Sequence, residues 1–472
     1  MKLNSFKYAL LALVFPFLAH AQQTPQAILQ KTKSAMGLDR LKKPVFHCYY
    51  NEVSLGREQS DRTYAPFFTT ATNAEVWYSA QHNVQRMEQS TIRVGTGPGK
   101  NPVVVYNGIG KNYFVRDTVY KPFHFEYDKL NVWMVLLDWL ADPDVKQVKN
   151  ERYRDFDRLV LARKAAVGEE RLFIDPKTYF PIKLDYYELH SLWGQQHIEM
   201  VYSNWKLTEN SFYPNSAFRL EDGEPMYYRT LGKSNLSDSL SLFAKIGSLP
   251  ASGPKNLNLE WYTSEQPTLI KVSENTYLSK NRMYTETFTR IGDTIYLLDA
   301  TLNEERAKQD EQLIKKTFPG IHKFVLVVTD LAWPHIGGMR YWVSKGATVI
   351  SHSASKQFIE KVINRKWVFQ PDELQKHPVK LKFVAVDQFR ALANNQLQIF
   401  PINGIGSEGA LACYLPADQL LWASDYIQTV ASPSAYAKEV IDAVNREKLK
   451  PLKMVAQHVG LTDWQQVLKV NP

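Results

Sequence analysis

The spacing of hydrophobic and polar positions changes about halfway along the chain. From residue 22 to about residue 230, short β-rich runs alternate with polar turn sequences, and Ile198, Met200 and Tyr202 recur at every second position, as in a half-buried strand. The turn signals are Asn107-Gly108, Asp175-Pro176 and Asp222-Gly223. One continuous apolar stretch, NVWMVLLDWLADP (131–143), predicts a helix that Pro143 ends. We therefore expect a mostly antiparallel β domain over residues 22–240, with a helix against one face of a curved sheet.

The second half alternates strand and helix patterns. DTIYLLDATL (293–302) and KFVLVVTD (323–330) predict strands, and NEERAKQDEQLIKKTF (303–318) predicts a helix. A further helix is expected in SPSAYAKEVIDAVNREKL, with Ser432 as N-cap and Pro433 at the first helical position. This alternation favours an α/β sandwich over residues 265–472. LPASGPKN (249–256), rich in Pro, Gly and Ser, marks a linker within residues 241–264.

The amino-terminal stretch is typical of a signal peptide. Lys2 and Lys7 precede or border an apolar run from Tyr8 to Ala19, and Ala19-His20-Ala21 fits the small-x-small cleavage pattern. The run is too short to span a bilayer, and no other uninterrupted apolar run approaches the required length. We expect residues 1–21 to be removed, and an exported protein, periplasmic or secreted, without a transmembrane segment in the mature chain.

Charge and cysteine content narrow the possible partners. The formal net charge of +9 falls to +7 without Lys2 and Lys7, but the basic residues are scattered rather than clustered. We therefore expect no nucleic-acid partner.

Cys48 and Cys413 both lie in apolar, strand-like contexts. An oxidising compartment would permit a disulfide, but small buried hydrophobic residues are the favoured interpretation.

A short motif that begins at the end of the strand predicted at 323–330 contains candidate functional residues. TDLAWPHIGG (329–338) has the frame T-H-x-H-x-D-H-x-G-G, and GIGSEGALACYLPADQLLWASDYI and AQHVG follow in order further along the chain. In this order the segments resemble landmarks of the metallo-β-lactamase superfamily across residues 265–472. The resemblance implies an αββα sandwich with metal ligands on loops at one edge of the paired sheets.

The resemblance also implies that the family's dinuclear metal site is mostly lost. Three histidines hold the first family metal, and the matching positions here are Asp330, Ala332 and Gly406. Alanine and glycine offer no donor atom, and one carboxylate cannot hold a zinc ion that takes about four ligands.

The second family metal keeps three of its four ligand positions. Pro334 replaces an aspartate, whereas His335, Asp425 and His458 remain. Two histidines and one carboxylate are a known ligand set for zinc, iron or manganese with open positions. We expect no cofactor or one weakly bound divalent metal, and His352 to be a strand-end histidine rather than a replacement ligand.

Two functions stay open from the sequence, so whether the chain is an enzyme is uncertain. In the favoured one, the chain is an exported pseudo-enzyme or binding protein that holds an unknown small molecule or apolar ligand in the old active-site cleft. In the alternative, it is a weakened mononuclear metal-dependent hydrolase with metal at His335, Asp425 and His458 and Asp330 as a proton acceptor. The metal content of the purified protein would best distinguish them.

The first half resembles the periplasmic lipoprotein-carrier group over about 100 residues. The matching stretch is RLFIDPKTYFPIKL (171–184), followed by further strands. The resemblance implies an open β half-barrel that encloses acyl chains. A docking or folding module without a ligand is the favoured alternative.

Overall fold

The computed structural model describes residues 23–56, 60–93, 103–116, 119–122, 127–248, 266–281 and 284–472. The expected signal peptide (1–21) and the linker segment 249–256 lie outside the described residues. Within the described part of the chain, no helix is both long and apolar enough to cross a membrane.

The first half forms one large sheet in which every strand pairing is antiparallel. In spatial order the strands are β6 (Val119–Pro122), β5 (Tyr113–Arg116), β4 (Val103–Gly108), β3 (Val84–Arg93), β2 (Thr70–Ser79), β1 (Val45–Ser54), β14 (Glu224–Ser237), β13 (Ser211–Glu221), β12 (Gly194–Thr208), β11 (Pro181–His190), β10 (Glu169–Ile174), β9 (Phe156–Lys164) and β7 (Lys146–Gln147), with β8 (Glu151–Tyr153) paired to β9. The expected turns at Asp175-Pro176 and Asp222-Gly223 join β10 to β11 and β13 to β14. The β4–β5 turn lies at residues 109–112, because Asn107 and Gly108 still belong to β4.

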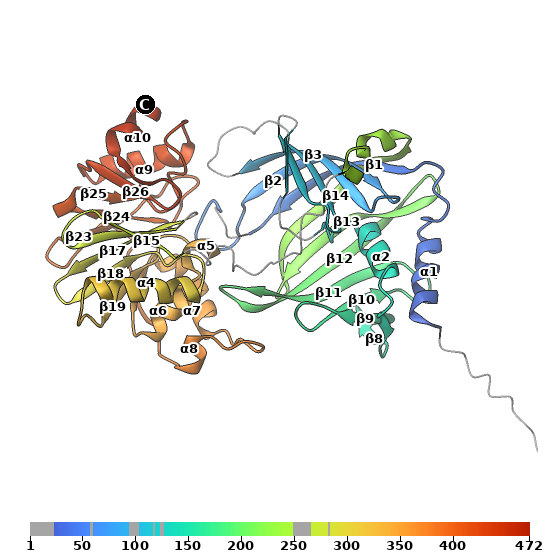
Figure 1. Ribbon diagram of the computed structural model, residues 1–472, viewed down its shortest axis with the longest axis horizontal. Helices are drawn as coiled ribbons and strands as arrows, with labels where there is room; N and C mark the ends of the chain where they lie inside the picture. The colour runs from blue at the N-terminus through green and yellow to red at the C-terminus, as the bar shows by residue number, and fades with distance from the viewer. Residues whose placement is uncertain are drawn as a thin grey trace, which may run out of the picture.

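Two helices pack against this sheet (Figure 1). α2 (Val132–Leu140) is the predicted helix, and the side chain of its N-cap Asn131 accepts hydrogen bonds from the amides of Trp133 and Met134. α1 (Pro25–Ala35) was not predicted, although Thr24 caps it and Pro25 opens it. Its apolar positions are few, so tertiary packing of Ile28 and Leu29 rather than a strong sequence pattern accounts for it. Two short 3₁₀ helices, η1 (Ser239–Phe243) and η2 (Ile246–Ser248), follow β14.

The second half contains two sheets. The first, with seven strands, runs in the order β15 (Thr268–Lys271), β16 (Thr276–Lys280), β17 (Thr285–Ile291), β18 (Thr294–Leu298), β19 (Lys323–Val327), β20 (Thr348–Ser351) and β21 (Lys382–Ala385). The second, with six strands, runs β22 (Arg390–Leu392), β23 (Leu397–Pro401), β24 (Leu411–Leu415), β25 (Leu420–Trp422), β26 (Lys453–Ala456) and β27 (Gly460–Asp463).

Helices cover the outer faces of the two sheets (Figure 1). The helices of the second half are α4 (Glu304–Thr317), α5 (Trp333–Ile336), α6 (Met339–Ser344), α7 (Lys356–Asn364) and α8 (Glu373–Lys376), then α9 (Ala435–Arg446) and α10 (Trp464–Val470), with 3₁₀ helices η3 (Ser353–Ser355) and η4 (Pro416–Asp418). Of these, α5 lies on the side that faces the first half (Figure 1). Val327 of the first sheet and Trp422 of the second belong to the apolar core between the sheets. Trp342 lies in the core of the first sheet with its helices, and Val440 in that of the second.

The predicted start of α9 was wrong by two residues. The N-cap is Ser434, whose side chain accepts a hydrogen bond from the amide of Ala437, and the helix begins at Ala435. Ser432 and Pro433 precede the helix. Two serines with similar spacing offer the same capping chemistry, and only the path of the chain selects one.

The tip of the β11–β12 hairpin enters the core of the second half. Leu192 and Trp193 are fully buried and belong to the same apolar cluster as Trp342 and Ile359. The Arg365 guanidinium donates to the carbonyl oxygens of Trp193, at 2.6 Å, and Gln195. This hairpin of the first half therefore completes a core of the second half. The expected division of the chain at the linker had treated the two halves as separate domains.

The two cysteines are free and buried, as predicted from their contexts. Cys48 lies in the core beneath the large sheet, and Cys413 lies between the two sheets of the second half. Burial raises the pKa of the Cys48 thiol to about 12, so it stays protonated and unreactive at neutral pH.

Candidate functional site

The candidate site lies where three strands of the second half end. Asp330 lies in the loop after β19 and His335 in α5, which follows that loop. The loop after β25 supplies Asp425, and the loop after β26 supplies His458. Because β18 and β19, and β25 and β26, pair in parallel, their carboxyl ends reach the same edge. The structure therefore brings all four predicted site residues together at one edge of the paired sheets.

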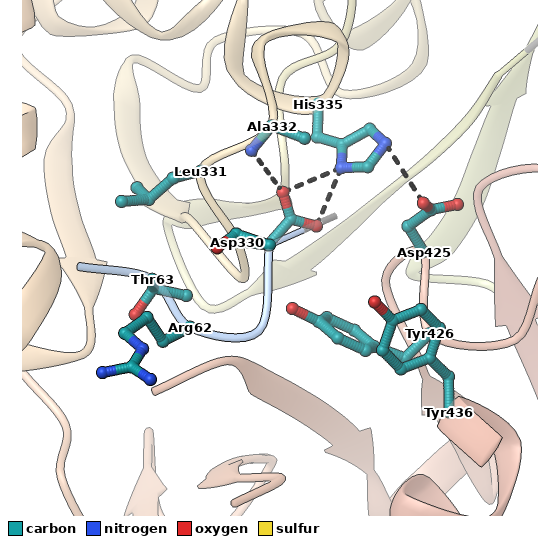
Figure 2. A pocket seen from close by; sticks show the side chains of 10 residues that line it. Arg62, Thr63, Asp330, Leu331, Ala332, His335, Asp425, Tyr426 and Tyr436 are labelled. Carbon is teal, nitrogen blue, oxygen red and sulfur yellow. Dashed lines mark hydrogen bonds and ion pairs between the residues drawn. The ribbon is translucent and has the colours of Figure 1, made fainter. Parts of the chain in front are cut away.

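Asp330 and His335 form a buried pair (Figure 2). Nδ1 of His335 lies 2.8 Å from both carboxylate oxygens of Asp330. The same carboxylate accepts hydrogen bonds from the amide of Ala332 and the hydroxyl of Ser424, each at 2.8 Å. A carboxylate with both oxygens engaged in this way orients the imidazole, and leaves Nε2 of His335 directed toward Asp425.

The three possible metal ligands face one another. One donor atom from each of His335, Asp425 and His458 lies within 4.8 Å of the others. Nε2 of His335 is 3.8 Å from one Asp425 oxygen, and Nε2 of His458 is 3.2 Å from the other. Two ligands of one tetrahedral zinc ion would be about 3.4 Å apart. The donor set and its spacing therefore fit a single divalent ion, with the Asp425 carboxylate placed between the two histidines.

Asp330, Ala332 and Gly406, the positions that the sequence resemblance assigned to a first metal, offer one donor side chain among them. Ala332 is buried and lacks a donor, and Gly406 offers only its backbone. The amide of Gly406 donates to Glu439 at 2.9 Å, and the Ser407 hydroxyl donates to the same carboxylate at 2.6 Å. Glu439 thus organises this loop through hydrogen bonds.

Burial and neighbouring charges set the protonation of the site. Burial by itself lowers the pKa of His335, but the carboxylates of Asp330 and Asp425 outweigh it and raise this pKa to about 9. Burial likewise opposes ionisation of Asp330, but His335 holds the pKa of Asp330 below its usual range. At neutral pH the pair is therefore an imidazolium with a carboxylate.

A second buried carboxylate lies behind this pair. Asp299 accepts hydrogen bonds from the hydroxyl of Thr329 at 2.6 Å and from the side-chain amide of Gln457 at 3.0 Å. Burial, with the nearby charge of Asp330, raises the pKa of Asp299 to about 7. It follows β18 with φ near +63°, and it connects the three site loops from the inner side.

A segment from the first half lies over the mouth of the site. The amide of Thr63 donates to the carbonyl of Glu408 at 3.0 Å, and the amide of Glu408 donates to the carbonyl of Asp61 at 3.3 Å. Ser60, Arg62 and Thr63 line the pocket together with Asp330, His335 and Asp425 (Figure 2). The free volume that remains is about 10 Å³, which holds about one water molecule.

Sequence reasoning missed several residues of this pocket. Tyr426 and Tyr436 line it, and the ring of Tyr284 lies 4.9 Å from that of His458. Nothing in the local sequence around residues 60–63 signals their position, because they come from the β1–β2 connection more than 260 residues earlier in the chain. His352, by contrast, accepts a hydrogen bond from the amide of Ala354 and caps η3, which agrees with the strand-end role expected for it.

No family model and no curated protein matches this chain. Solved structures do. DIM-1 metallo-β-lactamase has 12% sequence identity and a TM-score of 0.35, over 44% of this chain and 95% of that one. A metallo-β-lactamase from Pontibacter korlensis has 17% identity and a TM-score of 0.35, over 43% of this chain and 96% of that one. TMB-1 has 10% identity and a TM-score of 0.34, over 44% and 95%. These values concern the fold alone and carry no argument about activity.

Proposed function

We propose that this chain is an exported protein of the metallo-β-lactamase type of αββα sandwich whose dinuclear centre is lost, and that it acts as a pseudo-enzyme or binding protein. The observation that carries the proposal is the state of the first metal position. Two of its three side chains, Ala332 and Gly406, have no donor atom, and the third, Asp330, is engaged by His335. The segment at Ser60–Thr63 over the pocket supports a role other than turnover of a large substrate.

The second candidate function is that of a weakened mononuclear metal-dependent hydrolase. One specific observation favours it, the convergence of His335, Asp425 and His458. Nε2 of both histidines and the Asp425 carboxylate would hold a single ion. When bound, such an ion supplies Lewis-acid catalysis and lowers the pKa of a bound water. Asp330 would fix the Nδ1 proton of His335 and so keep Nε2 available as the ligand atom.

Metal content and hydrolysis of the purified mature chain test both functions. We expect at most one divalent ion per chain, weakly held, and β-lactam and thioester hydrolysis near background. His335→Ala and His458→Ala should each abolish any bound metal. His352→Ala is the matched control and should leave it unchanged, since His352 caps η3. Two tightly bound ions by elemental analysis would overturn the pseudo-enzyme proposal, and one ion with metal-dependent turnover would establish the second function.

Restoring the missing donors tests the inferred origin of the site. A variant carrying Asp330→His, Ala332→His, Pro334→Asp and Gly406→His places the family's ligand types on these loops. We expect its metal content to rise above that of the unmodified chain. An unchanged metal content in a folded variant would mean that the loops do not have the geometry of the family.

Export rests on the amino-terminal sequence. Ala19 and Ala21 fit the small pockets of signal peptidase, so the mature chain should begin at Gln22. Amino-terminal sequencing of secreted or periplasmic material checks this. A chain that keeps Met1 in that fraction would contradict it.

A further inference from the structure

The large sheet of the first half borders a large cavity among the described residues. Its volume is about 1060 Å³, and residues of β10, β11, β13 and β14 line it together with α2 and the segment before α2. This is at the upper end of the range for small-molecule sites. The cavity is separate from the candidate metal site, with which it shares no lining residue.

The cavity wall carries an excess of negative charge. Seven carboxylates face five cationic groups among the described lining residues: Glu52, Asp128, Asp138, Asp142, Glu170, Glu188 and Glu221 against Lys129, Arg163, Lys164, Arg219 and Arg229. The chain as a whole has a net charge of +9, so this excess of two negative charges is opposite in sign to the rest of the molecule. A concave wall of one excess sign concentrates the field inside it.

Two carboxylates of the wall, Glu170 and Glu188, are ionised at neutral pH. Burial raises the pKa of Glu170, but Lys129 and Arg163 outweigh it and hold this pKa below its usual range. Burial also raises the pKa of Glu188, but the Arg219 guanidinium outweighs it and holds this pKa below its usual range. Charged walls of this kind disfavour an acyl chain. They therefore speak against the lipid-enclosing cavity that the lipoprotein-carrier resemblance implied.

One ammonium group, that of Lys129, is already bound by the wall and shows how the wall holds such a group. Nζ of Lys129 lies 3.0 Å from a Glu170 oxygen and 3.6 Å from the centre of the Tyr186 ring. A carboxylate on one side and an aromatic face on the other is the arrangement that binds organic cations. Tyr127, Tyr187 and Tyr227 add further aromatic groups to the lining.

We propose that this cavity binds a small organic polycation, a polyamine with two or more ammonium groups. Two carboxylates in excess of the wall's own cations match at least two ligand charges, and the tyrosine rings accept the ammonium groups and the methylene chain between them. The proposal does not depend on the function proposed for the metal site.

Asp142 is the carboxylate whose removal disturbs the wall least. It lies 3.7 Å from Arg163, and Arg163 keeps closer contacts to Asp138 and Glu170 when Asp142 is neutral. Asp144, two residues away, is exposed and does not line the cavity. Asp142→Asn and Asp144→Asn are therefore a matched pair with the same change of charge.

Titration calorimetry of the full mature chain with spermidine at low ionic strength tests the proposal. We expect saturable binding that Asp142→Asn weakens about fivefold and that Asp144→Asn leaves within twofold. Tyr187→Leu, which removes a half-exposed ring from the lining, should weaken binding about threefold. The neutral chain 1,8-octanediol should not bind.

Three outcomes would overturn the proposal. They are no saturable binding of spermidine, equal weakening by Asp142→Asn and Asp144→Asn, and full displacement of spermidine by Mg²⁺ at the same concentration of charge. The last result would mean that the wall attracts cations in general. Circular dichroism and an unchanged unfolding midpoint would confirm that each variant is folded.

Discussion

At the scale of single residues, the pair of His335 and Asp330 determines the state of the candidate site. The sequence resemblance assigned Asp330 to a metal-ligand position, but its oxygens accept hydrogen bonds from His335, Ala332 and Ser424. This arrangement favours a role for Asp330 in orienting His335. It is a weaker fit to the role of proton acceptor that the sequence suggested for Asp330. A divalent ion must displace the proton that His335 carries at neutral pH, so metal binding would be proton-linked.

The raised pKa of His335 predicts a pH-dependent stability. The folded pKa of about 9 lies above the ordinary histidine value of 6.5, so the ion pair stabilises the metal-free fold fully below pH 6.5 and loses this contribution as the pH rises through about 9. We expect the free energy of unfolding of metal-free protein to fall across that window. His335→Gln should flatten this part of the profile, and denaturant unfolding at several pH values measures both. An identical fall in His335→Gln would contradict the assignment.

At the scale of elements, the first half sends two segments into the second. One is the β11–β12 hairpin tip, with Leu192 and Trp193 in the core of the second half. The other is the β1–β2 connection, whose Thr63 pairs with Glu408 beside the candidate site. Both come from turns between strands, where an apolar or small residue can extend beyond the sheet without disturbing its register.

The buried hairpin tip predicts a large cost for its truncation. Leu192→Ala removes a fully buried side chain and should lower the free energy of unfolding by about 2–5 kcal/mol. Leu189→Ala makes the same chemical change at a side chain of which 44% is exposed, so it should cost less than about 1 kcal/mol. Urea unfolding of the two variants compares them directly. Equal costs would mean that the hairpin tip does not contribute to the core.

A glycine under the β1–β2 connection provides a test of the covered pocket. Gly409 has φ near +75°, and a Cβ there would lie 2.4 Å from Oγ1 of Thr63. Gly409→Ala should therefore displace the segment at Ser60–Thr63 and raise its amide hydrogen exchange. Gly292→Ala has a similar positive φ, +63°, without an atom within 4 Å of the new Cβ. It imposes the same backbone strain but should leave the exchange of residues 60–63 unchanged.

At the scale of the whole molecule, the two halves form an assembly that a cut linker should not separate. The segment 249–256 has the composition of a protease-sensitive linker. The hairpin tip and the hydrogen bonds of Arg365 join the halves independently of that linker. Core packing of this kind resembles an obligate interface rather than a transient contact.

Limited proteolysis tests this view. We expect cleavage within 249–256 to yield two fragments that elute together in gel filtration under native conditions and separate only in denaturant. A chain that begins at residue 266 should be poorly folded when it is expressed alone, because it lacks Leu192 and Trp193. Separate elution of the native fragments, with a well-folded second half, would argue for two independent domains.

The sequence predicted local structure where one physical signal dominates. The apolar run at 131–143, the turn at Asp175-Pro176 and the helix at 303–318 all appear in the structure, because periodicity and turn chemistry act over a few residues. Predictions that depended on competition between neighbours were less exact. Ser434 rather than Ser432 caps α9, and Gly108 belongs to a strand rather than to the turn after it.

The sequence by itself determined the chemical inventory of the candidate site: His335, Asp425 and His458 as possible ligands, and Ala332 and Gly406 as positions without a donor side chain. Donor atoms are a property of residue type, so no structure was needed for that conclusion. Only the tertiary structure decided that Asp330 binds His335, that residues 60–63 cover the pocket, and that charged groups line the cavity of the large sheet. These features join residues from distant parts of the chain, and no local pattern of hydrophobic and polar positions records which distant segments will meet.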